Sequence, residues 1–338
     1  MTLQRDPLAT LIVLNWNGEK YLAQCLPSLL ALDYSSYEIV LVDNGSTDGS
    51  IEYVTSEFPQ VRVIENGRNL GFAGGMNVGI VQSKGDIVVL LNNDIIVRRD
   101  WLCELVGAMV ADERIGIAGC KIFFADGETL QHTGGIISYP LALPDHYGYR
   151  QPDTGAYDMV SDVDYVTSAA MAIRRATLTE VGNLDEGFFP IYYDDTDICY
   201  RARAAGWRVV YVPTAVLTHL ESATMVRDSY RYFESFHRSR LRFVLKHLSI
   251  EQVLKEFVPA EAAWLTQTKS FQERRALNRA YKAALLMAPV LYAVREGCDQ
   301  PVFDALQEVA EALVGLQAEV WRCHGNPQSL IATGGESL

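Results

Sequence analysis

The sequence predicts an α/β fold: a mostly parallel central sheet with helices on both faces, followed by an extension made only of helices. The first two hundred residues alternate short apolar runs with segments of helical periodicity. That alternation is typical of parallel strands covered on both faces. From about residue 226 onward the periodicity is helical only. The 338 residues suffice for one large domain or two ordinary ones.

The first half of the chain contains most of the expected strands. Four apolar runs predict strands at residues 11–14, 39–42, 61–64 and 87–91. Helices are expected between them and over residues 101–110, whereas residues 115–190 are less regular. A later helix starts near Asp195 and ends at Gly206, and a strand follows over residues 207–212, which Pro213 is expected to end.

Composition and charge exclude several classes of protein. The formal charge of −13 disfavours nonspecific nucleic-acid binding, so no nucleic-acid partner is expected. None of the six cysteines forms a C-x-x-C pair, which argues against zinc and favours a reducing compartment. The longest apolar run, residues 283–294, is too short to span a bilayer, and the N-terminus lacks signal-peptide features. We expect a cytoplasmic protein, with peripheral contact at the inner face of the membrane left open.

Polar residues follow each of the first four expected strands. The segments are Asn15-Trp16-Asn17-Gly18, Asp43 to Gly49, Asn66 to Asn77, and Asn92-Asn93-Asp94. Because the carboxyl ends of parallel strands share one rim, these segments predict a ligand of about the size of a nucleotide. Each turn alone is equally consistent with an ordinary loop.

A glycine-rich stretch follows the third expected strand. Its glycines at 71, 74, 75 and 79 do not fit G-x-G-x-x-G, and no G-x-x-x-x-G-K-[ST] loop is present. Glycines before a helix let backbone N–H groups approach a diphosphate. The alternative is tight packing of a helix against a strand.

Asp94 and His219 are candidate metal ligands. A carboxylate at a strand end, beside diphosphate oxygens, suits a hard divalent cation, and an imidazole completes such a site. The alternatives are an Asx turn at Asp94 and an ordinary hydrogen-bonded histidine at residue 219.

Three aspartates stand within four residues at Asp194, Asp195 and Asp197. One interpretation is a general base that accepts a proton from an attacking hydroxyl. The other is charge placed at a helix N-terminus, where the helix dipole favours anions.

Together these segments resemble the bacterial family 2 glycosyltransferases, which have the GT-A fold, and within them the rhamnosyltransferase-like group. The resemblance covers about residues 8–222, in the family's order. It is carried by Val13 to Gly18, Val42 to Ser50, Asn69 to Gly79, Leu90 to Asp94, Asp185 to Phe189, and Asp194 to Trp207, with Pro213 and His219.

The resemblance implies a role for each matching residue. Asp195 is the implied catalytic base, Asp94 and His219 hold Mg²⁺ or Mn²⁺, and Asp43 reads the nucleotide base. The other implied nucleotide-sugar contacts are Asn15, Asn17, Asn69, Gly74, Asn77, Asn92 and Asn93. The implied acceptor-side or supporting residues are Asp194, Asp197 and Trp207. The chain departs from the family pattern at three positions. Asn92 replaces the first acid of the metal-binding D-x-D element, and Asp194 replaces the longer glutamate of the E-D pair. Ser168 occupies a position where the family often has glycine.

The resemblance also implies a division of the chain. Residues 1–222 form the catalytic domain, with a nucleotide-sugar half over about 1–97 and an acceptor half over about 98–222. Residues 223–330 form a helical region, and 331–338 a flexible tail.

Two features of the helical region have open interpretations. The segment 226–247 interleaves basic and aromatic residues, among them Arg227 and Arg240, and is either a solvated face or a contact for anionic lipid or a lipid-diphosphate acceptor. The apolar stripe from Phe303 to Val320 is either core or the interface of a homodimer.

The expected function is metal-dependent, inverting sugar transfer. The donor is a dTDP-, UDP- or GDP-sugar, with rhamnose the first choice, and the acceptor is a bacterial glycan or lipid-linked saccharide. A sugar nucleotidyltransferase is a second hypothesis, but the G-x-G-x-R loop it needs after the first strand is absent. A non-catalytic scaffold is the third.

Overall fold

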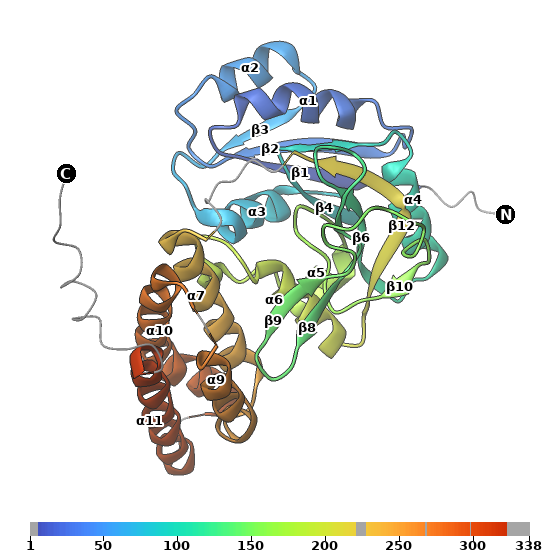
Figure 1. Cartoon of the computed structure of the whole chain (residues 1–338). Coiled ribbons are helices and arrows are strands. Elements are labelled where there is room, and N and C mark those ends of the chain that lie inside the picture. The colour runs from blue at the N-terminus through green and yellow to red at the C-terminus, as the bar shows by residue number, and fades with distance from the viewer. Residues whose placement is uncertain (1–5, 221–227, 268, 298, 323–338) are drawn as a thin grey trace. The chain divides into compact units, whose positions relative to one another are not determined.

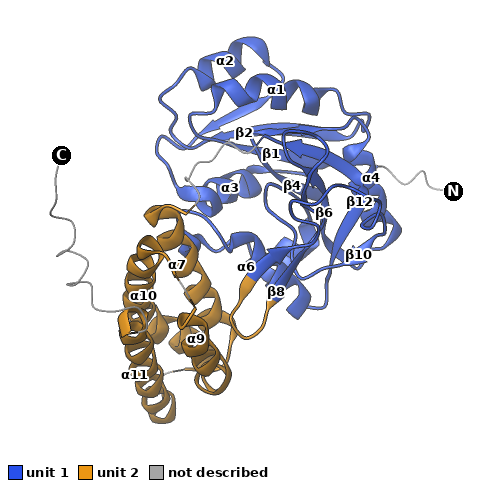
Figure 2. Ribbon diagram, in the orientation of Figure 1, with its two compact units in different colours: residues 1–137, 144–222 blue, residues 138–143, 223–338 orange. Residues whose placement is uncertain are grey.

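The computed structural model describes residues 6–220, 228–267, 269–297 and 299–322 (Figure 1). The chain forms two compact units, coloured separately in Figure 2. The sheet unit comprises Met1–Ile137 and Pro144–Ser222, and the helical unit comprises Ser138–Leu143 and Ala223–Leu338. Arg227, the expected boundary at residue 222 and the expected tail 331–338 lie outside the described residues.

A ten-stranded sheet organises the sheet unit. Its strands are β1 (Ala9–Asn15), β2 (Tyr37–Asp43), β3 (Arg62–Glu65), β4 (Ile87–Asn92), β5 (Ile95–Val97), β6 (Ile115–Phe123), β7 (Leu130–His132), β10 (Ser161–Asp162), β11 (Ala170–Arg174) and β12 (Arg208–His219). A separate hairpin pairs β8 (Gly135–Ser138) with β9 (Leu143–His146).

The helices of the sheet unit alternate with its strands. They are α1 (Glu19–Leu30), α2 (Ser50–Glu57), α3 (Gly71–Gln82), α4 (Trp101–Ala111), α5 (Arg175–Val181), the short 3₁₀ helix η1 (Glu186–Phe188) and α6 (Asp194–Ala204). The helical unit contains α7 (Tyr230–His247), α8 (Ile250–Gln252), the π-helical turn η2 (Val253–Phe257), α9 (Val258–Leu265), α10 (Phe271–Glu296) and α11 (Gln300–Arg322).

The sheet confirms the α/β fold class but is more mixed than expected. Along the order β3-β2-β1-β4 every pairing is parallel. β11 then pairs antiparallel with both β4 and β6, and β12 runs parallel to β6. β11 belongs to the irregular segment of the sequence, where no periodicity indicated its direction.

Two hydrophobic cores lie on opposite faces of the sheet. Alternate residues of one strand point to opposite faces, so Ile12 belongs to one core and Leu11 to the other. α3 packs on the Ile12 face, and α1 and α4 contribute to the core on the Leu11 face. Fully apolar strands are therefore required because both faces are buried.

β12 is longer than the sequence predicts. Pro213 does not end the strand: a bulge between Val212 and Val216 interrupts the pairing with β6, which then resumes as far as Thr218. A bulge is a position where a sheet tolerates proline, because no ladder hydrogen bond is required there. The extension carries β12 to His219.

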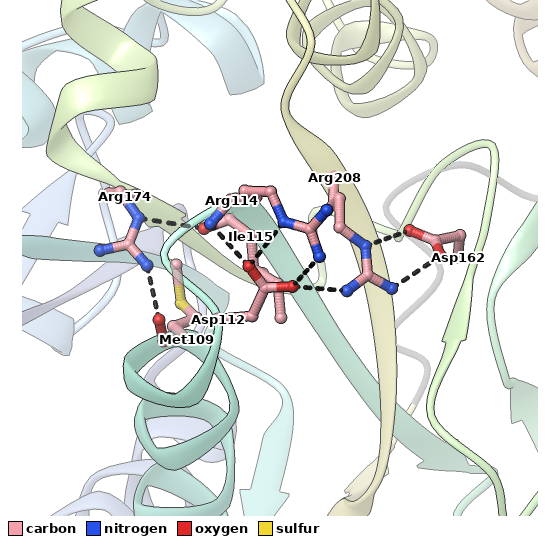
Figure 3. A network of polar contacts seen from close by, with 7 residues as sticks. All are labelled: Met109, Asp112, Arg114, Ile115, Asp162, Arg174 and Arg208. Atoms are coloured by element: carbon pink, nitrogen blue, oxygen red, sulfur yellow. Dashed lines mark hydrogen bonds and ion pairs between the residues drawn. The ribbon is translucent and has the colours of Figure 1, made fainter.

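A network of charged residues joins the strand starts that lie at the other end of the sheet from the polar rim (Figure 3). Asp112, after α4, accepts from Arg114 and from Arg208 at the start of β12. Arg208 also donates two hydrogen bonds, of 2.8 and 2.7 Å, to the carboxylate of Asp162 on β10. The two arginines hold the pKa of Asp112 well below its usual value.

The helical unit packs α10 against α7 and α11. The described part of the Phe303–Val320 stripe is partly core: Leu313 and Val320 are buried, but Phe303 is exposed. Within the described ranges, no helix is both long enough and apolar enough to cross a membrane.

Arg240 corrects the expectation of a uniformly solvated basic face on α7. It is fully buried and makes a two-point ion pair with the equally buried Glu261, at 2.8 and 2.5 Å. Tyr281 donates to the same carboxylate, and Arg240 donates to the carbonyl of Leu141 at 3.0 Å. Arg240 therefore holds the segment Ser138–Leu143 within the helical unit.

Candidate active site

The carboxyl ends of β1, β2 and β4 lie beside one another. In the strand register, Asn15 is the partner of Asp43, and Leu14 is the partner of Asn92. The polar segments that follow these three strands are therefore brought to one rim, as expected for a parallel arrangement.

Asp43 is buried and organises the turn after β2. Its Oδ1 accepts from Asn15 Nδ2 at 3.0 Å and from the Ser46 hydroxyl at 2.5 Å. Its Oδ2 accepts from the backbone N–H groups of Gly45 and Ser46, at 3.0 and 2.8 Å. Four donors occupy the acceptor positions of one carboxylate. Asp43 thus stabilises the turn at Gly45 and Ser46, which follows β2 at the rim.

Asn93 and Asn17 extend this network. Asn93 Nδ2 donates to Asn15 Oδ1 at 2.7 Å, and Asn17 Oδ1 accepts from the backbone N–H of Thr47 at 2.7 Å. A Cβ atom at Gly18 would lie 2.0 Å from Asn93 Nδ2, so only glycine leaves room for this contact. The loops after β1, β2 and β4 are therefore interlocked.

The glycine stretch forms the start of α3, and one of its glycines packs tightly against the sheet. A Cβ at Gly79 would lie 2.5 Å from Ile12 Cγ2, so this glycine permits close helix–strand packing. A Cβ at Gly74, in the first turns of α3, would lie 3.0 Å from Leu70 Cβ and 3.8 Å from Glu186 Cδ. Asn69 Oδ1 accepts from the backbone N–H of Gly71 at 2.8 Å.

Asn77 is engaged by the segment before η1. Its Nδ2 donates to the Leu184 carbonyl and to Glu186 Oε1, at 2.9 and 3.0 Å, and its Oδ1 accepts from the Leu184 N–H. The amide connects α3 to the segment at Leu184 and Glu186.

Asp94 and His219 meet at the rim although 125 residues separate them. His219 Nε2 lies 3.0 Å from Asp94 Oδ1 and 3.4 Å from Asn92 Nδ2. His219 Nδ1 lies 2.7 Å from Gln131 Oε1 on β7. β12 reaches this position only because it continues through its bulge.

The donor set at Asp94 and His219 fits a divalent cation. When Nδ1 donates its proton to Gln131, Nε2 directs a lone pair at a carboxylate oxygen, an arrangement that requires a proton or a cation. One carboxylate and one imidazole, with phosphate oxygens of a ligand, are a common protein contribution to an Mg²⁺ or Mn²⁺ site. Among the described residues, no group of three or more His, Cys, Asp or Glu side chains could hold a metal ion.

Backbone strain precedes the acid pair. Tyr192 and Tyr193 have φ angles of 81° and 67°, in the left-handed region that non-glycine residues rarely adopt. Each such residue costs about 1–3 kcal/mol, and such strain clusters at functional sites. The strained turn sets the start of α6, where Asp194 and Asp195 stand.

The two acids have different surroundings. Asp194 is buried, whereas Asp195 keeps part of its surface exposed. Asp195 accepts from the backbone N–H groups of Ser168 and Thr196, at 3.2 and 2.7 Å, and Asp194 accepts from the Ser168 hydroxyl at 3.3 Å. Ser168 therefore orients both carboxylates.

Burial raises the pKa of both acids. The pKa of Asp194 rises to about 8, chiefly because its carboxylate is desolvated and secondarily because Asp195 lies beside it. Burial also raises the pKa of Asp195, and hydrogen bonds from Thr196 and Ser168 oppose that effect. The surroundings of Asp194 therefore favour its protonated form.

A short series of contacts connects the acid pair to the rim. The Asn92 N–H donates to the Ala169 carbonyl at 3.0 Å, and Ala169 directly follows Ser168, which holds Asp195. Asn92 also contacts His219. These contacts link Ser168, which holds Asp195, to Asn92 and His219 at the rim.

Asp197 and Trp207, two of the expected site residues, form contacts within the scaffold of the sheet unit. Asp197 forms a buried ion pair with Arg201 at 2.8 Å, and Arg201 also donates to backbone carbonyls at residues 181–183. Trp207 precedes β12 and lies at the opposite end of that strand from His219, with its indole donating to Glu180 at 2.8 Å. The acceptor-side expectation for Trp207 is therefore corrected: the side chain fixes helix packing.

Sequence reasoning missed Gln131. It lies in an irregular segment, and only the pairing of β7 with β6 brings it to His219. A pair formed by the buried His132 and the partly exposed His146 was also missed; their Nδ1 atoms lie 2.5 Å apart, and His132 Nε2 accepts from the Thr167 N–H. The run Gln131-His132-Thr133 was the available signal, because three polar residues in a row are unusual for a strand of a buried sheet.

Comparison with curated proteins identifies several relatives. A Sinorhizobium fredii protein, y4gI, is 30% identical over 66% of this chain, a match that spans 25% of its own length. An N-acetylglucosaminyl-diphospho-decaprenol L-rhamnosyltransferase of Mycobacterium tuberculosis is 27% identical over 69% of this chain and 82% of its own length. The rhamnosyltransferase WbbL of Escherichia coli is 24% identical over 72% of this chain and 94% of its own length.

Solved structures share the fold. A structure of GalNAc-T7 with UDP, GalNAc and Mn²⁺ has a TM-score of 0.61 at 16% identity and covers 86% of this chain and 58% of its own. The structure of the mannosyltransferase PcManGT of Pyrobaculum calidifontis, in complex with GDP-Man and Mn²⁺, has a TM-score of 0.51 at 17% identity. The match covers 94% of this chain and 86% of PcManGT.

The family model described as "Glycosyl transferase family 2" matches residues 10–180, which span β1 to α5 and thus include the interlocked loops of the rim. The expected resemblance is confirmed: this chain belongs to glycosyl transferase family 2, has relatives named rhamnosyltransferases, and is built on a GT-A-like fold.

Proposed function

We propose that this chain transfers a sugar, with inversion, from a nucleotide diphosphate-sugar to an acceptor hydroxyl, and that Asp195 is the catalytic base. The observation that carries this proposal is the series of contacts from Asp195 through Ser168 and Asn92 to the Asp94–His219 pair. This series of contacts supports the proposal that a carboxylate suited to proton abstraction acts beside a site suited to a diphosphate.

Each part of the rim has a distinct task in this proposal. The Asp43–Asn15 network shapes the loops that receive the nucleotide, with Asn17, Asn69, Gly74, Asn92 and Asn93 along the same rim. Asp94 and His219 hold Mg²⁺ or Mn²⁺, which neutralises charge on the leaving diphosphate when bound. Asp194 and Asp197 support the base through the start of α6. Asn77 positions α3 against the acceptor half.

Inversion follows from a single displacement. Asp195 accepts the proton of the acceptor hydroxyl while that oxygen forms its bond to the anomeric carbon. The bond from that carbon to the diphosphate oxygen breaks on the opposite side, and the electron pair leaves with the diphosphate. A pKa raised by burial makes Asp195 a stronger base than an exposed aspartate while leaving it able to ionise.

The proposed donor sugar is rhamnose and the proposed acceptor a lipid-linked saccharide or growing bacterial glycan. Two relatives are named rhamnosyltransferases, and one of those names specifies a diphospho-decaprenol substrate. dTDP-rhamnose is the first donor to test. The solved neighbours hold UDP or GDP-mannose, so UDP- and GDP-sugars form the comparison set. We place the reaction at the inner face of the cytoplasmic membrane.

The deciding experiment compares wild type with Asp195→Asn. We expect the variant to bind the nucleotide sugar normally in isothermal titration but to lose transfer to a mixed glycolipid acceptor extract. Asp100→Asn, an exposed acid beside α4, is the matched control and keeps full activity. Full activity of Asp195→Asn would remove this residue from the mechanism. No donor turnover by the wild type with either metal would favour the scaffold hypothesis.

A further inference from the structure

The helical unit contains a basic cavity. It has a volume of about 370 Å³ and opens between α7, α10 and α11, lined by Tyr230, Arg275, Asn278, Arg279, Lys282 and Trp321. Three of these residues are cationic and belong to α10, and two are aromatic. The cavity therefore combines positive charge with flat apolar surface.

The positive charge of this cavity is largely uncompensated. Arg279 pairs with Glu234 at 3.3 Å, with 71% of its side chain still exposed. Arg275 lies 5.0 Å above the Tyr230 ring, a cation–π contact. Among the described side chains, no carboxylate forms an ion pair with Arg275 or Lys282. In a chain with a net charge of −13, such a local excess of cations is unusual.

The same helix continues as an exposed apolar ridge. Leu286, Val290 and Val294 are 80%, 64% and 86% exposed. They follow Lys282 at successive spacings of four, so they lie on nearly the same face of α10. Single exposed aliphatic residues are ordinary, but three along one helix face form a surface for an interaction.

We propose that this face of α10 docks on an anionic phospholipid bilayer, with the helix lying along the membrane surface. Arg275, Arg279 and Lys282 meet the lipid phosphates, and the aliphatic ridge enters the outer part of the acyl region. Tyr230 and Trp321 suit the headgroup level, where amphipathic rings concentrate. The anionic bilayer is proposed as the partner because its negative charge complements the three cations of this face.

A second copy of the chain fits this face less well. In a symmetric pair, the same surface meets itself. The seven residues named on α10 include three cations and no acid, so their face is not self-complementary in charge. Arg240 of α7 takes no part in this surface, because it is buried and ion-paired with Glu261. The inference does not depend on sugar transfer.

The test is co-sedimentation of the full chain with vesicles of phosphatidylglycerol and phosphatidylcholine, against vesicles of phosphatidylcholine alone. We expect binding to the anionic vesicles only, weakening with salt. Arg275→Gln/Arg279→Gln/Lys282→Gln should bind roughly 100-fold more weakly, since each basic residue near an anionic surface contributes about a fivefold factor. Leu286→Ser/Val290→Ser/Val294→Ser should also lose binding, even at low salt.

Matched controls alter exposed residues of the sheet unit. Lys84→Gln/Arg99→Gln/Arg150→Gln removes the same charge, and Val81→Ser/Met159→Ser removes exposed apolar surface; both should bind as wild type does. Circular dichroism checks that each variant is folded. If a triple variant is not folded, the single variant Lys282→Glu replaces it, and its binding to anionic vesicles should be weaker than that of wild type. Equal binding by all variants overturns the proposal.

Two further outcomes would also overturn it. A dimer in light scattering that the Leu286→Ser/Val290→Ser/Val294→Ser variant dissociates, without vesicle binding, assigns the ridge to self-association. A rise in melting temperature with inorganic diphosphate that needs Arg275, without vesicle binding, assigns the cavity to a soluble phosphate ligand.

Discussion

Asp194 and Asp195 are neighbours in sequence, but their environments predict different responses to the same substitution. Asp195→Asn removes the proposed base, and we expect kcat to fall by about 100-fold or more. Asp194→Asn resembles the neutral acid that burial already favours at Asp194, so we expect activity within a factor of about ten of wild type. Initial rates under saturating donor measure both. Equal losses in the two variants would contradict this division of roles.

The raised pKa of Asp194 also predicts a pH dependence of stability. Its folded-state pKa of about 8 exceeds the value near 4 of an unfolded chain. Between these values the folded state binds more protons, so the free energy of unfolding falls as pH rises from about 4 to about 8. Asp194→Asn removes that dependence. Urea unfolding of both proteins at pH 5 and pH 8 should therefore show a larger decrease in wild type than in the variant.

Single residues also mark how far the sequence could predict the site. Asp94, Asp195 and the strand-end asparagines were identified because their types and order match a pattern. Gln131 was not, because only the antiparallel pairing of β7 brings it to His219. Trp207 was placed at the site by its position in a motif, but its indole contacts Glu180 at the far end of the strand.

At the scale of elements, α3 is held to the sheet by a glycine contact. A Cβ at Gly79 would meet Ile12 and Val42 at 2.5 and 3.0 Å. Gly79→Ala should therefore destabilise the protein by about 1–3 kcal/mol through overpacking. Gly107→Ala is the matched control: it lies within α4, has no neighbour within 4 Å of the added Cβ, and should stabilise by about 0.5–1 kcal/mol. Urea unfolding distinguishes them; equal effects would refute the packing argument.

The arginine network of Figure 3 supports stability and not substrate binding, because it joins strand starts far from the rim. Arg208→Met leaves Asp162 without its partner, and we expect a melting temperature lower by roughly 2–4 °C. The KM for the donor should stay at its wild-type value. A changed KM with an unchanged melting temperature would contradict this assignment.

Elements were predicted better than their connections. Buried strands such as β1 and β4 are uniformly apolar, and a uniform run gives a clear signal. β12 was cut short at Pro213 because proline usually ends a strand, whereas a bulge accommodates it here. β11 could not be given a direction, because neither its length nor its composition distinguishes parallel from antiparallel pairing.

For the whole molecule, the paired groups at the rim predict linked binding of metal and nucleotide. Mn²⁺ with a nucleoside diphosphate should raise the melting temperature more than either alone, because the phosphates supply ligands that Asp94 and His219 lack. Asp94→Asn and His219→Ala should abolish that additional rise. Identical shifts in wild type and both variants would place the metal elsewhere.

The capture of Ser138–Leu143 by Arg240 has a consequence for dividing or recombining this protein. A chain shortened at Ser222 retains that hairpin tip but loses the guanidinium that holds the Leu141 carbonyl. A hybrid that takes its C-terminal helices from a relative loses Arg240 and Glu261 together, so the Leu141 carbonyl again lacks its donor. Because the chain crosses between the two units three times, a single cut at Ser222 does not separate them cleanly.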